Sequence, residues 1–472
     1  MISFIGSLVA LILGYYFYGK FVEQVFDVKL DMKTPAYLKE DGVDFIPITW
    51  GRVFLIQLLN IAGLGPIFGA IAGALFGPAA FLWIVLGSIF AGGVHDYLSG
   101  MISVRNDGVS ISEVVGEYLG ERARKFMRVF SIILLVLVGT VFMTGPAGLL
   151  ASMTNLNINI WLFVIIIYYF LATVLPVDKI IAKFYPLLGG SLLVMALGIA
   201  GGLILGDYQI PEITLSNLHP EGLSFWPMLF VTIACGAISG FHATQSPLMA
   251  RCLKTEKDGK RVFYGAMIAE GVIALIWAAA AMTLFGGPEG LATAMANNGG
   301  PAGIVKLVSD NMLGAAGGVL AMLGVVALPI SSGDTAFRSA RLILADIFKL
   351  DQSNKSNRFK LAIPLFVIGI LLSQMDFSII WRYFAWSNQT LAMVALWAGA
   401  SYLVKHDRFH WIATIPATFM TAVVVSYIII APEGLGIQGL LATVVGLLAA
   451  VFALGLFLVK EREGKSKREL TS

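Results

Sequence analysis

Residues 61–66 have the sequence Ile-Ala-Gly-Leu-Gly-Pro and interrupt an apolar segment, 52–76, that is otherwise long enough to cross a membrane. Gly63, Gly65 and Pro66 disfavour a continuous helix, and hydrocarbon cannot satisfy the backbone groups that such a break frees. A break at this depth is tolerated where it faces a cavity, a substrate or an ion. The alternative is that these small residues only let helices pack closely.

A second break, Gly-Ala-Ile-Ser-Gly at residues 236–240, interrupts the apolar segment 225–250. Each broken segment opens a set of five apolar segments, and the two sets begin on opposite sides of the membrane. This arrangement is typical of an inverted repeat, in which the two broken helices meet at the bilayer midplane. We therefore expect four regions: a first helix with its loop, two five-helix repeats, and two final helices with a basic tail, at 1–50, 51–205, 206–405 and 406–472.

The composition excludes a soluble domain. Hydrophobic residues make up 58% of the 472 residues, charged residues only 13%, and the mean hydropathy is +0.84, whereas soluble domains carry about 25% charged residues. A membrane-spanning helix needs about 20 apolar residues. The sequence predicts an all-α polytopic membrane protein with about 13 such helices, near 2–19, 52–76, 78–104, 127–152, 158–175, 184–205, 225–250, 262–286, 312–345, 359–374, 386–404, 409–431 and 435–459.

The basic residues lie almost entirely on one side of this predicted topology. Thirty of the 32 Lys and Arg residues fall in loops or tails on that side, and Lys306 and Arg382 fall on the other. By the positive-inside rule the basic side is cytoplasmic. We therefore expect a bacterial or archaeal inner-membrane protein with its N-terminus outside and its C-terminus in the cytoplasm.

Polar residues near the two breaks are the candidates for solute binding. Amides that follow Pro66 would open a half-helix suited to a carboxylate, and His242 is the one histidine that we place well inside a membrane helix. A polar residue in the membrane is a functional candidate by default, although a histidine bonded to a nearby carbonyl is the simpler alternative. The predicted binding residues are Gly63, Gly65, Pro66, Ile67, Ser239, Gly240, His242, Gln245, Asn388 and Gln389, of which the last two could instead join helices.

A coupling ion has two candidate sites. A proton could be carried by His242, because small changes in environment move histidine protonation across physiological pH, or by Asp334. The hydroxyls of Ser331, Ser332 and Thr335 offer oxygens of the kind that sodium prefers. Asp334 stands four residues before Arg338, so one helical turn could simply pair them.

Other features predict nothing catalytic. The chain has no HExxH motif and no GxxxxGK[ST] phosphate loop, and we identify no second intramembrane carboxylate beside Asp334. His95 and Asp96 are expected at a solvated helix end. Cys235 and Cys252 are too few and too close in sequence for a disulfide framework. We expect no enzyme, no metal or other cofactor, and no nucleic-acid partner.

Several motifs together resemble the carbon starvation protein A family over about residues 50–395. They are Ile61 to Pro66, Asp107-Gly108 with Glu113, Ser239-Gly240-Phe241-His242-Ala243, Asp334 with Arg338 and Arg341, and Asn388-Gln389 with Leu391-Ala392. The resemblance implies the five-plus-five, LeuT-type fold of the amino acid, polyamine and organocation superfamily. The chain departs from longer family members at Ile56-Gln57, where they carry a histidine pair, and at Gln245-Ser246-Pro247.

The resemblance implies a secondary transporter that imports peptides or a small carboxylate such as pyruvate during carbon starvation, by symport with H⁺ or Na⁺. Two alternatives stay open from the sequence, a symporter for amino acids and a membrane sensor that binds the solute without moving it. The expected partners are the solute and the lipid bilayer, and the sequence leaves open whether copies of the chain assemble.

Overall fold

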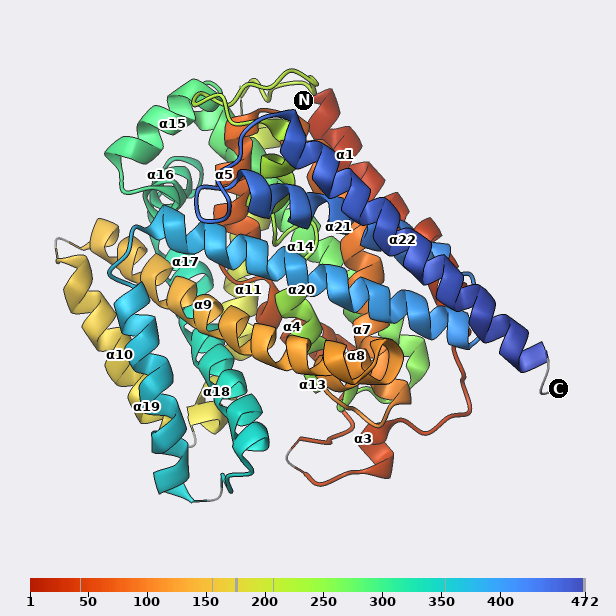
Figure 1. The fold of residues 1–472 in the computed structure, drawn as a ribbon. Coiled ribbons are helices and arrows are strands. Elements are labelled where there is room, and N and C mark those ends of the chain that lie inside the picture. Colours follow the sequence, from red (N-terminus) through yellow and green to blue (C-terminus); the bar gives the residue numbers. More distant parts are fainter. Residues whose placement is uncertain (43, 155, 175–176, 207, 353, 470–472) are drawn as a thin grey trace.

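The computed structural model describes residues 1–42, 44–154, 156–174, 177–206, 208–352 and 354–469 (Figure 1). The side chains of 174–186 and of the basic tail from 463 on lie outside the described residues. Helices form nearly all of the described part, and its β pairing is limited to one isolated bridge between Ile48 and Leu253.

The first half of the chain contains the following helices, where η marks π- or 3-10 turns: α1 (Ile2–Leu13), η1 (Gly14–Tyr18), α2 (Gly19–Phe26), α3 (Pro35–Leu38), α4 (Trp50–Ile61), η2 (Gly65–Gly69), α5 (Ala70–Gly73), η3 (Ala74–Phe76), α6 (Ala79–Leu86), η4 (Gly87–Gly92), α7 (Gly93–Arg105), α8 (Ile111–Leu119), α9 (Glu121–Met153), α10 (Ile158–Val174) and α11 (Val177–Leu205). The second half contains η5 (Phe225–Leu229), α12 (Phe230–Thr232), α13 (Gly240–Ala250), η6 (Glu256–Asp258), η7 (Lys260–Tyr264), α14 (Gly265–Leu284), α15 (Pro288–Asn297), α16 (Pro301–Leu313), α17 (Ala315–Ala321), η8 (Met322–Ala327), α18 (Leu328–Phe348), α19 (Lys355–Leu372), α20 (Phe377–Lys405), α21 (Trp411–Ile430) and α22 (Leu440–Glu469).

The all-helical membrane fold is confirmed, and all thirteen predicted segments are helical in whole or in part. Eight helices of the described part are long and apolar enough to cross a membrane, and a ninth span results if the bent pair around residue 62 counts as one. The count of thirteen therefore exceeds what length and composition alone support. The segment at 158–173 is shorter, and the segment at 225–250 is interrupted.

Both predicted breaks are present. α4 ends at Ile61, and the chain resumes at Gly65 with its axis turned by 55°. In the second break α12 ends at Thr232 and α13 begins at Gly240, with an irregular segment between them. Gly236 has φ +91°, a conformation that glycine adopts without strain.

The two breaks contact each other. A Cβ atom on Gly65 would lie 2.1 Å from the Cβ of Cys235, and one on Gly236 would lie 3.5 Å from the Cα of Pro66. Each irregular segment therefore packs against the other through a residue that lacks a side chain. The broken helices that begin the two predicted repeats are therefore in contact. The region boundaries at 51–205 and 206–405 stay a prediction.

We predict that Gly65→Ala destabilises the protein, because the added methyl group would overlap the Cys235 side chain. Overpacking of this kind costs about 1–3 kcal/mol, and we expect a lower thermal unfolding temperature in detergent. Gly51→Ala in the first turn of α4 is the matched control, since its Cβ would meet no atom within 4 Å. Equal unfolding temperatures for both variants would contradict the observed contact between the breaks.

Candidate functional site

Asn388 on α20 holds the second break. Its Oδ1 accepts hydrogen bonds from the Phe241 backbone N–H at 2.7 Å and from Ser239 Oγ at 3.1 Å, and its Nδ2 lies 2.9 Å from the same hydroxyl and 3.3 Å from Cys235 Sγ. All of these groups are buried. One amide thus binds two side chains within the irregular segment, and it satisfies an N–H in the first turn of α13.

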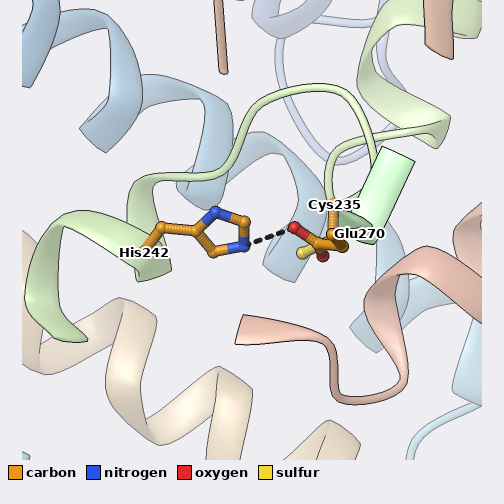
Figure 2. Close-up of side chains that lie close together, drawn as sticks. All are labelled: Cys235, His242 and Glu270. Atoms are coloured by element: carbon orange, nitrogen blue, oxygen red, sulfur yellow. Dashed lines mark ion pairs between the residues drawn. The ribbon is translucent and has the colours of Figure 1, made fainter. Parts of the chain in front are cut away.

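A cluster of ionisable side chains lies beside this segment. His242 Nδ1 is 2.9 Å from Asp96 Oδ2, and His242 Nε2 is 3.3 Å from Glu270 Oε2 (Figure 2 shows the second pair). The other Asp96 oxygen is 2.7 Å from His95 Nδ1. None of the four side chains has any exposed surface. The cluster is a continuous chain of two carboxylates and two imidazoles in the protein interior.

Three helices supply this cluster because small residues let them approach. Asp96 comes from α7, His242 from the first turn of α13 and Glu270 from α14. A Cβ on Gly92 would lie 2.2 Å from the Ala237 carbonyl oxygen, and one on Gly271 would lie 2.4 Å from Ser88 Oγ. Ser88 in turn donates a hydrogen bond to the Gly236 carbonyl at 2.9 Å. The irregular backbone therefore packs against η4, which in turn packs closely against α14.

Two sequence expectations are wrong at this cluster. Asp96 and His95 were expected at a solvated helix end, but they are 0% and 1% exposed. Glu270 is a second buried carboxylate, which the sequence analysis did not identify, although it stands alone in the apolar stretch Gly265–Leu284. An isolated acid in a membrane helix is a functional signal by default, and this signal could have found it.

The structure brings some predicted binding residues together and leaves others apart. Gly63, Gly65, Pro66 and Ile67 are buried in the first break, but the amides of Ile67 and Phe68 already donate to the Leu64 carbonyl, at 3.2 and 2.7 Å. Ser239, Gly240, His242 and Asn388 gather at the second break. Gln245 and Gln389 are buried and donate to Thr244 Oγ1 and to the Phe230 carbonyl, so Gln389 joins α20 to α12.

The predicted sodium ligands lie on another helix, α18, which packs along α9. Ser332 Oγ and Thr335 Oγ1 donate to carbonyls one turn earlier, at 3.2 Å each. The predicted pair of Asp334 and Arg338 is confirmed, at 3.2 Å. Phe142 on α9 lies beside both the first break and α18, since Cβ atoms on Gly63 and Gly333 would touch it. Ser331 and Asp334 lie on α18, which contributes no residue to the Asp96, His242 and Glu270 ion pairs.

A cavity of about 270 Å³ lies near the first break. Phe68 lines it from η2, immediately after the break. Its polar lining side chains are Thr144, Asn159, Ser373 and Gln374. The walls come from the end of α9, the starts of α10 and α16, and the turn between α19 and α20. These helix ends are on the side opposite the basic loops.

Arg105 at the end of α7 joins several segments on the basic side of the molecule by hydrogen bonds. Its Nε and one terminal nitrogen lie 2.9 Å from the two oxygens of Glu256, which is fully buried. The other terminal nitrogen donates to Tyr402 Oη at 2.9 Å, and the Asp27 carbonyl accepts a further bond at 2.6 Å. Four segments that are far apart in sequence thus meet at one guanidinium group.

Comparisons with known proteins agree with this architecture. A family model described as carbon starvation protein CstA matches residues 1–154, 144–287 and 284–427. A relative named peptide transporter CstA from Bacillus subtilis is 26% identical over 525 residues, covering 88% of each chain. An uncharacterised membrane protein of Haemophilus influenzae is 41% identical over 349 residues, covering 62% of this chain and 94% of that protein.

Solved structures share the fold. A mutant of the Eremococcus coleocola manganese transporter aligns with a TM-score of 0.52 at 15% identity, over 93% of this chain and 99% of that one. Mhp1, a nucleobase-cation-symport-1 family transporter in a closed conformation with bromovinylhydantoin bound, aligns with a TM-score of 0.51 at 14% identity, over 89% and 96%. At these identities the likeness concerns the fold alone.

We predict that Asn388→Ala lowers the free energy of unfolding by about 1–3 kcal/mol, because it leaves the buried Phe241 N–H without its acceptor. Denaturant or thermal unfolding in detergent measures the loss. Asn311→Ala is the control, since its exposed side chain bonds only to a carbonyl of its own helix and its removal should change stability by less than about 0.5 kcal/mol. A loss no larger than that of the control would show that Asn388 does not hold the break.

Proposed function

The chain belongs to the carbon starvation protein CstA family, and from this premise we propose that it is a secondary active transporter that imports peptides or a small carboxylate such as pyruvate. The observation that carries the proposal is the contact between the two helix breaks beside a buried polar cluster. Irregular backbone is found at membrane depth where it is buried in protein or lines a cavity, and in transporters it binds the solute and the coupling ion.

The cavity beside the first break supports a small solute. Its volume of about 270 Å³ is just below the range of roughly 300–1,000 Å³ that is common for ligand pockets, which suits a three-carbon acid or a short peptide. Polar side chains at 144, 159, 373 and 374 offer hydrogen bonds to such a solute, and Phe68, which follows the break in sequence, also lines the cavity. The relatives named as peptide transporters support the peptide class.

We further propose that import is coupled to a cation, H⁺ or Na⁺. The buried cluster contains two carboxylates, which favours a positively charged occupant in a medium where unpaired charge is costly. Ser331, Ser332, Asp334 and Thr335 on α18 form the alternative site. Imposed gradients of each ion decide between H⁺ and Na⁺.

The proposed location is the inner membrane, with the N-terminus outside. Its support is the predicted topology, in which 30 of the 32 Lys and Arg residues fall in loops or tails on one side of the membrane. In this orientation the 270 Å³ cavity is on the outer side, where a solute to be imported would enter.

We predict that proteoliposomes containing the protein accumulate labelled pyruvate or a labelled dipeptide when a gradient of H⁺ or Na⁺ is imposed, and that His242→Ala lowers the initial rate at least tenfold. The variant removes the group that lies between Asp96 and Glu270. A tenfold loss corresponds to about 1.4 kcal/mol. Glu270→Gln, which keeps the shape of the side chain, is a second test.

His406→Ala is the control for that experiment, because His406 is exposed at the end of α20 and far in sequence from both breaks. Size-exclusion profiles and thermal unfolding establish that each variant is folded. If neither solute accumulates under either gradient, the peptide-or-pyruvate proposal fails. Specific binding of a solute without accumulation would favour a sensor, and accumulation of amino acids instead would reassign the substrate.

A further inference from the structure

Three donor atoms of different chemistry face one another at the second break. Cys235 precedes the break's glycine, His242 follows in α13, and Glu270 faces both from α14 (Figure 2). One ligand atom from each residue lies within 4.8 Å of the other two, and all three side chains are buried. We propose that these residues bind a soft divalent transition-metal ion of the zinc class, a property beyond the proposed transport function.

The unsatisfied polar atoms of the cluster point to a missing cation. His242 Nε2 and both Glu270 oxygens are buried and make no hydrogen bond within the described part of the chain. The 3.3 Å contact between His242 Nε2 and Glu270 Oε2 is the one ion pair among these atoms, and buried polar atoms without hydrogen bonds require an explanation. A metal ion between them would bind the lone pairs that are otherwise unused.

The surroundings of His242 are those of a metal ligand. A ligating histidine almost always donates its other ring N–H to a carboxylate or carbonyl, which fixes the tautomer. Here the Nδ1 atom lies 2.9 Å from Asp96 Oδ2, and the tautomer that donates from Nδ1 to Asp96 leaves the Nε2 lone pair for a metal ion. Asp96 is held in turn by His95 at 2.7 Å. The Asn388 amide N–H, 3.3 Å from Cys235 Sγ, would stabilise a thiolate at that atom.

Charge and ligand type select the class of metal. On binding, the Cys235 thiol loses its proton to solvent and a metal–sulfur bond forms, so that one thiolate and one carboxylate neutralise the 2+ ion. Thiolate and imidazole ligands favour Zn²⁺ and similar ions, whereas Mg²⁺, Ca²⁺ and Mn²⁺ prefer oxygen. We therefore expect Zn²⁺ and Co²⁺ to bind in preference to Mn²⁺ and Mg²⁺.

The three ligand atoms need only a small shift to reach the spacing of a tetrahedral metal site. With metal–ligand distances of about 2.0–2.3 Å, the ligand atoms of a tetrahedral site are roughly 3–4 Å apart. His242 Nε2 and Glu270 Oε2 already meet this spacing at 3.3 Å, and the sulfur atom must move by roughly 1 Å. Three protein ligands leave a fourth position for water or for a polar group of a solute.

The test is metal binding by the full-length protein in detergent after treatment with a chelator. Titration with Zn²⁺ against a chromophoric chelator should give one ion per chain. The absorption of the Co²⁺-loaded protein should contain a thiolate-to-cobalt charge-transfer band. Cys235→Ser should remove this band and, like Glu270→Gln, weaken Zn²⁺ binding at least tenfold, and Asp96→Asn should weaken it by about 10–100-fold.

Cys252→Ser is the matched control, because Cys252 is the other buried free thiol and lies outside the cluster. It should bind Zn²⁺ and show the cobalt band as the unmodified protein does. The proposal is overturned if the unmodified protein binds no stoichiometric Zn²⁺, or if Cys235→Ser and Cys252→Ser bind equally. Should Cys235→Ser fail to fold, absence of the thiolate band in the unmodified protein overturns it. None of these readouts depends on transport.

Discussion

A helix that stops inside a membrane must satisfy its free backbone groups without water, and this constraint governs the centre of the molecule. Asn388 satisfies one of these backbone groups, because it accepts a hydrogen bond from the Phe241 N–H. The same amide also binds Ser239 and lies close to Cys235. Ser88 and Trp83 meet another part, by donating to the Gly236 and Ile233 carbonyls at 2.9 and 3.1 Å. The irregular segment is thus a fixed structure with its polar side chains held in set directions.

The helical fold and the location of both breaks could be predicted from the sequence, because they depend on local chemistry. A cluster such as Gly63, Gly65 and Pro66 disfavours a continuous helix, although a single proline such as Pro146 lies inside α9. Loop charges likewise predict sidedness without any knowledge of packing. The pair of Asp334 and Arg338 could be predicted for the same reason, since one helical turn fixes its geometry. A resemblance to the family could also be stated from short motifs alone.

The ionisable cluster could be predicted only in part, because its members come from three distant segments. His242 stood out through its neighbours, but Asp96 resembled a solvated helix end and Glu270 was one acid in a long apolar stretch. Cys235 gave no disulfide signal and was set aside. Only the tertiary contact of α7, α13 and α14 gives these residues a common role, and no spacing in the sequence encodes that contact.

The Arg105 network makes the two ends of the molecule unequal. A bidentate ion pair with a fully buried carboxylate closes the basic side, whereas a cavity lies towards the other. Opening the basic side would separate Arg105 from Glu256, and leaving a buried charge unpaired costs about 3–5 kcal/mol unless water reaches both groups. If the protein alternates between two access states, as the proposed transport requires, this cost favours the state that is closed on the basic side. Under the import proposed above, release of the solute on the basic side would then be the step that needs a driving force.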